Sequence, residues 1–174
     1  AGRTVLAFFW ADNSLNSSLR NNIQTMMQGL QAMKDSAALL VYWDGEASDI
    51  SWPEPCIVEY VTNGQGGINS LSKGTIDAMM ADKNTSIYDL IGIGNIRKKY
   101  PPQTSTEKTV MQTVIGDMMS AYPSESYGII FGSHGSGWLP TITGTRSIGQ
   151  DGGRYSSDTA LIPVSYTHLR AHET

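Results

Sequence analysis

The chain is poor in cysteine and in charged residues. Its 174 residues include a single cysteine, Cys56, which excludes an internal disulfide framework and a structural zinc site built from cysteines. No apolar run reaches the roughly 18 residues that a transmembrane helix requires, so we expect no membrane span. Charged residues make up 16% of the chain, form no basic run and leave a net charge of −4, so nucleic acid is not an expected partner.

The chain does have enough apolar sequence to build a core. Hydrophobic residues make up 40% of it, which is typical of a globular protein and not of a disordered one. At roughly 100–200 residues per domain, a chain of this length is one domain or part of one.

The first half of the sequence predicts a strand–helix–strand unit. Residues 4–11 and 37–43 are continuous apolar runs rich in β-branched and aromatic residues, as expected of strands covered on both faces. Between them, apolar residues recur at spacings of three and four from Leu15 to Met33, which predicts an amphipathic helix. Two parallel strands with a crossover helix follow from this order.

The middle of the sequence is less regular. Residues 56–61 predict a shorter strand nearer an edge of the sheet, because their hydrophobicity partly alternates. Weak helical patterns appear around residues 75–80 and 87–96. The remainder of residues 62–109 gives no clear pattern.

The last legible elements are a helix over residues 107–122, with Pro123 just beyond its end, and a strand over residues 127–132. Residues 139–157, rich in Gly, Thr, Ser and Arg, are expected to form a long loop. The whole order predicts an α/β sandwich with a largely parallel sheet, whose active site lies at the carboxyl ends of the strands.

Three polar segments follow predicted strands and should meet at that edge. They are Asp12-Asn13, Asp44-Gly45 and Ser133-His134-Gly135. His134 stands out, because histidine serves as a general acid or base near neutral pH and the glycines around it let a substrate approach closely. A histidine hydrogen-bonded at the end of a strand, with no catalytic role, explains its position equally well.

Residues 126–140, Ser-Tyr-Gly-Ile-Ile-Phe-Gly-Ser-His-Gly-Ser-Gly-Trp-Leu-Pro, closely resemble the histidine motif of the clostripain (C11) family of cysteine peptidases. Residues 5–15 resemble that family's first strand and Asp-Asn loop, residues 41–45 its second strand, and residues 148–151 the segment after the histidine. The resemblance covers residues 3 to about 158. Its form, with Ser before His and Trp-Leu-Pro after, is most similar to secreted relatives from Bacteroidales-type bacteria.

The resemblance implies a caspase-like, three-layer α/β/α sandwich, here incomplete, and a peptidase that cleaves after Arg or Lys. His134 would be the histidine of a His–Cys dyad, and the N–H of Gly135 would bind the oxyanion. Protein or peptide substrates and a secreted or cell-envelope location follow from the same resemblance. It implies no cofactor, although calcium occurs in the family. The expected contacts of Asp12 and Asn13 with substrate compete with simple capping of a turn.

The family's nucleophile is missing. It is expected downstream of Gln150-Asp151, in a stretch resembling Asp-Ala-Cys, and no cysteine occurs there. Cys56 stands before the histidine in the chain and is read as a buried thiol that packs as a small hydrophobe. We therefore expect the 174 residues alone to be inactive.

The end of the chain would explain why the nucleophilic cysteine is absent. Residues 164–174 have no counterpart in the family and resemble translated adapter sequence, so the peptidase-like part is expected to be residues 1–163. His168 and His172 are discarded as metal ligands for that reason. We hypothesise that the full-length protein cleaves itself after a basic residue in the loop of residues 139–157, with Arg146 favoured over Arg154. The simple alternative is that both are ordinary loop arginines exposed to solvent.

Two other functions remain open. One is a non-catalytic caspase-like domain that binds or scaffolds other proteins. The other is a serine hydrolase using Ser133 or Ser136, which ranks last because no Gly-x-Ser-x-Gly elbow is present.

Overall fold

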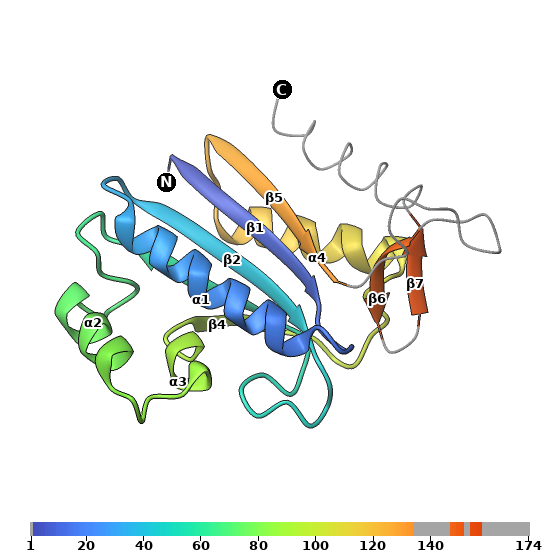
Figure 1. Ribbon diagram of the computed structural model, residues 1–174. Coiled ribbons are helices and arrows are strands. Elements are labelled where there is room, and N and C mark those ends of the chain that lie inside the picture. Colours follow the sequence, from blue (N-terminus) through green and yellow to red (C-terminus); the bar gives the residue numbers. More distant parts are fainter. Residues whose placement is uncertain (1, 134–146, 152–153, 158–174) are drawn as a thin grey trace.

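The computed structural model describes residues 2–133, 147–151 and 154–157, and within these ranges the chain forms a five-stranded sheet, a two-stranded hairpin and four helices (Figure 1). The elements are β1 (Arg3–Trp10), α1 (Asn16–Ala32), β2 (Ala37–Asp44), β3 (Cys56–Thr62), α2 (Lys73–Ala81), α3 (Ile87–Ile91), β4 (Asn95–Lys99), α4 (Lys108–Ala121), β5 (Ser126–Gly132), β6 (Ser147–Asp151) and β7 (Arg154–Ser157).

The five-stranded sheet has the order β4-β3-β2-β1-β5. Its centre is parallel, because β1 pairs in parallel with both β2 and β5. The strand–helix–strand unit predicted for the first half of the chain is thereby confirmed. β3 and β4 are antiparallel to their neighbours, so the sheet as a whole is mixed and less parallel than the sequence suggested.

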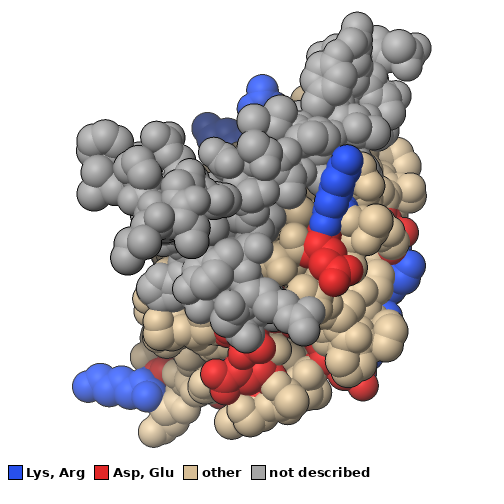
Figure 2. Space-filling view, turned by 90° about the vertical axis from the view of Figure 1, so that its right-hand side faces the viewer, with Lys and Arg blue, Asp and Glu red and all other residues tan. Residues whose placement is uncertain are grey.

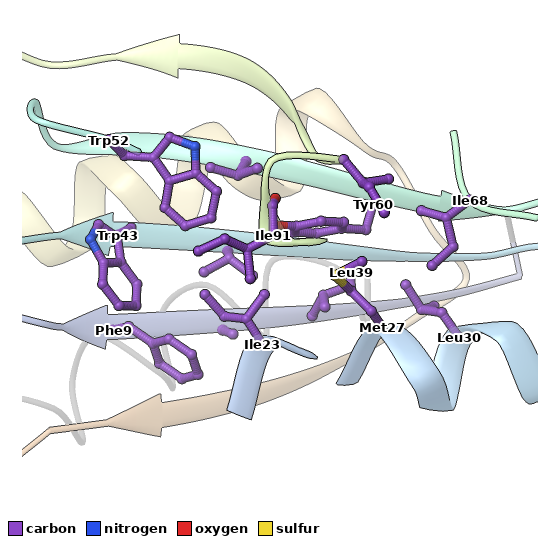
Figure 3. Close-up of a cluster of buried hydrophobic side chains, with 14 of the residues drawn as sticks. Phe9, Ile23, Met27, Leu30, Leu39, Trp43, Trp52, Tyr60, Ile68 and Ile91 are labelled. Carbon is purple, nitrogen blue, oxygen red and sulfur yellow. The ribbon is translucent and has the colours of Figure 1, made fainter. Parts of the chain in front are cut away.

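Helices cover both faces of the sheet. On one face, α1 packs through Ile23, Met27 and Leu30 against β1–β3, and α2 and α3 extend the same apolar cluster (Figure 3). On the other face, α4 buries a stripe of methionine and β-branched side chains against β1, β2 and β3. The result is the expected three-layer α/β/α arrangement. Burying both faces explains why β1 and β2 are almost wholly apolar in sequence.

One expectation for the middle of the chain was wrong in detail. The helix expected over residues 87–96 covers only Ile87–Ile91, begins at a capping box of Ser86 and Asp89, and is followed by edge strand β4. β3, expected nearer an edge of the sheet, is the second strand from that edge, so this expectation is confirmed. β4 has the sequence Asn-Ile-Arg-Lys-Lys and is exposed, so its pairing with β3 left no hydrophobic pattern to recognise.

The loop expected over residues 139–157 also contains a hairpin, because β6 and β7 pair antiparallel. Backbone pairing between short polar strands gives little signal in the sequence. The hairpin contacts β1 and lies near the end of the sheet toward which β1 and β5 point (Figure 1).

An ion pair joins edge strand β4 to helix α4. It leads to a prediction about how stability depends on pH. Asp117 on α4 accepts hydrogen bonds from Lys98 Nζ (2.8 Å) and Tyr100 OH (2.6 Å). Partial burial alone would raise the pKa of Asp117, but these hydrogen bonds and the Lys98 charge outweigh it and lower that pKa. Asp117 therefore stabilises the fold above the pKa of an unfolded aspartate, about 3.9, and loses this effect as the pH falls through its lower folded pKa.

We expect Asp117→Asn to lower the free energy of unfolding by up to about 1 kcal/mol at pH 7, because the pair is partly exposed. The difference from the unsubstituted chain should shrink below about pH 4, where the carboxyl becomes protonated. Urea unfolding at pH 7, 5 and 3 measures this trend. Asp77→Asn is the matched control, since Asp77 pairs with Lys73 at the exposed surface of α2 and should have little effect at any of these pH values. A difference for Asp117→Asn that does not change with pH would contradict the assignment.

Candidate functional site

The carboxyl ends of β1, β2 and β5 lie at one edge of the sheet, as the sequence predicted. Asn13, at the corner between β1 and α1, connects two of these ends. Its Nδ2 donates to the carbonyl of Trp10 (2.6 Å) and to Ser133 Oγ (3.2 Å), directly after β5. Its Oδ1 accepts the backbone N–H of Leu15 (2.9 Å), which shapes the turn into α1. The expected convergence of Asn13 with the segment after β5 is thus present.

Asp44 belongs to a buried network on the α4 side of the same edge. Its carboxylate accepts a hydrogen bond from Ser105 Oγ, which is also 2.7 Å from Tyr42 OH. Gln103 Nε2 donates to Tyr42 OH (2.8 Å), and Trp10 Nε1 donates to the carbonyl of Ser105 (2.8 Å). These contacts hold the segment before α4 to the ends of β1 and β2. Asp44 is almost fully buried, so its observed role is to anchor this segment.

A second polar cluster, on the α1 side, was not predicted from the sequence. Arg20 on α1 forms an ion pair with Asp49, and the two side chains are only 3% and 1% exposed. The guanidinium carbon of Arg20 lies 4.7 Å from the ring centroids of both Trp43 and Tyr88. Asn16 Oδ1 accepts a further hydrogen bond from Arg20 Nε (3.0 Å). The feature of the sequence that could have revealed this cluster is the position of Arg20. It lies three residues before Ile23, at the border of the apolar stripe of the helix.

Arg20, Asp49 and Tyr88 of this cluster help to line a pocket of about 320 Å³ between the first turn of α1, the loop after β2 and α3. Its polar lining includes Ser17, Glu46 and Ser48, and Ile50 and Tyr88 give it an apolar side. Asp12 and Asn13 are not among its lining residues in the described part of the chain. Figure 2, viewed from the side toward which the strands point, shows acidic and basic side chains together on the described surface.

Cys56 is level with Gly132, at the end of β5, along the strand direction. The two residues are nevertheless on different strands, separated by β2 and β1. The registers run from Cys56 to Trp43, from Trp43 to Phe9 and from Phe9 to Gly132. Three strand spacings of about 4.8 Å separate the two ends of this row by about 14 Å. Cys56 is 1% exposed, and burial, with a further contribution from the charge of Asp49, raises the pKa of its thiol to about 12. This is the environment of an inert, buried thiol.

The structure does not cover every residue that the sequence singled out. Asp12 lies half-buried at the corner beside Asn13. Gln150 and Asp151 lie in β6. The residues outside the described ranges are His134, Gly135, Ser136, Arg146, His168 and His172.

Two structural observations concern metals and membranes. Among the described residues, no three His, Cys, Asp or Glu side chains are gathered as a metal site would require. The helices in the described part of the chain are too short or too polar to cross a membrane.

Comparisons with known proteins place the chain among cysteine peptidases. The model of the clostripain family matches residues 7–162. Among solved structures, a cysteine protease from B. fragilis is 26% identical, with a TM-score of 0.56, over 82% of this chain and 96% of that one. A secreted C11 cysteine protease from Bacteroides thetaiotaomicron, solved with an irreversible peptide inhibitor, is 24% identical, with a TM-score of 0.58.

The likeness to the secreted protease covers 95% of this chain but only 39% of the other. The structure named iotapain, from the same organism, gives a TM-score of 0.62 at 14% identity, over 96% of this chain and 42% of that one. The chain therefore spans about two fifths of these two proteases. No curated protein matches the sequence.

Proposed function

Since the chain belongs to the clostripain family, we propose that it supplies the histidine part of a cysteine endopeptidase that cleaves after Arg or Lys. In this proposal His134 is the general acid and base, and the N–H of Gly135 binds the oxyanion of the tetrahedral intermediate. Asp12 contacts the bound peptide. The observation that carries the proposal is the Asn13–Ser133 hydrogen bond, because it joins the ends of β1 and β5 next to His134 in the sequence.

The nucleophilic cysteine belongs, in this proposal, to a part of the domain outside these 174 residues. Two observations support this. Cys56 is buried about 14 Å from the end of β5, by three strand spacings, too far for direct proton exchange with a residue that follows β5. The chain also spans only 39% and 42% of the two longer relatives.

The outer edge of β5 supports a further strand beside it. In the described part of the chain β5 pairs only with β1. Its sequence, Ser-Tyr-Gly-Ile-Ile-Phe-Gly, carries no charge, and Ile130 is 44% exposed. The opposite edge, β4, carries Arg97, Lys98 and Lys99, and charges of this kind protect an edge from pairing. A strand that carries the cysteine is the partner we propose for β5.

The proposed chemistry is hydrolysis of a peptide bond in two steps. The cysteine thiolate attacks the carbonyl carbon, and His134 gives a proton to the leaving amine, which leaves a thioester on the enzyme. Water then attacks the thioester, His134 takes its proton, and the acid product leaves with the thiol restored. Cleavage of the chain after Arg146, directly before β6, is the self-processing step that we include in this proposal, as is a secreted or cell-envelope location. No cofactor is proposed for these steps, and calcium, which occurs in the family, takes part in none of them.

Covalent labelling tests the absence of a nucleophile from these 174 residues. The probe is a short peptide that ends in Arg and carries a thiol-reactive group, and the control probe ends in Asp. We expect neither probe to label the folded chain above the level of the Cys56→Ala variant, because the Cys56 thiol is buried and protonated. After denaturation both probes should label Cys56 equally. Selective labelling of Cys56 by the Arg probe in the folded chain would refute the dyad as proposed.

A further inference from the structure

We propose that the outer edge of β5 pairs with β5 of a second copy, so that the 174-residue chain forms a symmetric dimer. Within the described residues β5 is an edge strand, bonded to β1 and lying opposite β4 across the sheet (Figure 1). The inference rests on the proposed function at one point: the strand proposed to lie beside β5 belongs to a part of the domain outside these residues. Without that strand, another chain can take its place.

The side chains of β5 are less covered than those of the strands at the centre of the sheet. All eight residues of β2 are buried, whereas none of the seven residues of β5 is. Ile130 is 44% exposed, and Ile129 and Phe131 are only partly buried against the apolar cluster on the α4 side. A strand added at this edge would remove part of this apolar surface from water, which favours association.

The two edges of the sheet differ in a way that selects β5 for pairing. β4 carries Arg97, Lys98 and Lys99, and its register with β3 shifts along the strand. Charges and irregularities of this kind protect an edge strand from pairing. β5 has no charged residue and no proline, and its register with β1 is continuous. Its edge is therefore straight and uncharged.

The sequence of β5 is complementary to itself when two copies run antiparallel about a two-fold axis at Ile129. Ile129 is then opposite Ile129 of the second copy, and Tyr127 is opposite Phe131 of the second copy. All three side chains lie on the α4 side of the sheet. Directly opposite residues have Cβ atoms about 4.5–5.5 Å apart, and aromatic and β-branched pairs at that distance stabilise a sheet.

The α1 side of the same pairing matches large residues with small ones. Ile130 is opposite Gly128 of the second copy, and Ser126 is opposite Gly132. A Cβ atom on Gly128 would have Val5 Cγ2 as its nearest neighbour, at 4.0 Å, so the surface beside Gly128 has room for the isoleucine. Because the interface uses the same strand on both chains, it closes after two copies. The two five-stranded sheets then form one continuous sheet.

Sedimentation equilibrium over a range of concentrations tests the dimer. We expect the average mass of the 174-residue chain to rise with concentration from that of one chain toward twice that value. Ile130→Lys should raise the dissociation constant at least about tenfold, because the two-fold axis brings two lysines into the interface and an edge lysine opposes pairing. Ile96→Lys is the matched control, since Ile96 lies on β4 and is 43% exposed, and it should leave the constant unchanged.

Oxidative crosslinking tests the register, in a Cys56→Ala background so that only the introduced thiols react. Ile129→Cys should form a disulfide between two chains, because the two copies of position 129 are directly opposite. Ile130→Cys should not, because its two copies are diagonal neighbours about 7–8 Å apart, too far for a disulfide. Equal crosslinking at both positions would contradict the pairing about Ile129.

A 174-residue chain that remains monomeric at every concentration would overturn the inference, as would equal weakening by Ile130→Lys and Ile96→Lys. A longer natural chain that includes the strand proposed above to carry the cysteine should be monomeric, because that strand takes the edge of β5. None of these measurements requires peptidase activity. Failure of the dimer is therefore distinct from failure of the proposed function, which is read from hydrolysis.

Discussion

Asp49→Ala is expected to destabilise the fold by about 3–5 kcal/mol, the usual cost of removing one partner from a buried ion pair. The variant leaves the guanidinium of Arg20 almost wholly buried without its counter-charge. Asp49 also accepts hydrogen bonds from Trp43 Nε1 (3.0 Å) and from the backbone N–H of Ser51 (3.1 Å), so the loop after β2 loses its anchor as well. Urea unfolding at pH 7 measures this change.

A double-mutant cycle separates the lost charge from the lost packing. Arg20→Met keeps most of the side-chain volume against the Trp43 ring and removes the charge. We expect the Arg20→Met/Asp49→Ala chain to be more stable than Asp49→Ala alone, because no unpaired charge is then buried. Asp77→Ala, at an exposed ion pair, is the control and should change stability by less than about 1 kcal/mol. A double variant no more stable than Asp49→Ala would show that the charge is not the main cause.

The sequence predicted those elements whose apolar residues follow a clear period. β1, β2 and α1 were located because both strands are buried on two faces and the helix has one apolar stripe. β4 was missed because an exposed, charged edge strand is specified by its hydrogen bonds to β3 and not by hydrophobicity. The pairing of β6 with β7 was missed for the same reason.

In the candidate site, too, some contacts could be predicted from the sequence and others could not. The meeting of Asn13 with Ser133 followed from the rule that parallel strands end at one edge. The Asp44–Ser105 network did not, because Ser105 lies 61 residues further along the chain in a segment without periodic pattern. Arg20 could have been noticed as a charged residue at the border of the apolar stripe of α1. Its partner, Asp49, lies in an irregular loop, and only the folded chain brings the two together.

His134→Ala is expected to reduce kcat/KM for peptide hydrolysis by at least about 10³-fold, because proton transfer by a positioned side chain contributes about 10²–10⁴-fold and also activates the thiol. A loss of 10³-fold corresponds to about 4 kcal/mol of transition-state stabilisation. The assay is made on a longer natural chain that includes the strand proposed above to carry the cysteine. Asn16→Ala in the same chain is the control for damage to the corner and should retain most of the activity.

Hydrolysis of matched peptides by that natural chain tests the central claim most directly. Four fluorogenic peptides that differ only in the residue before the cleaved bond, Arg, Lys, Ala or Asp, are compared with and without His134→Ala. We predict cleavage of the Arg and Lys peptides at least about 10²-fold faster than of the other two, with the loss in His134→Ala given above. A properly folded natural chain that hydrolyses none of the four would contradict the peptidase assignment and favour a non-catalytic binding domain. Equal activity in His134→Ala would contradict the dyad.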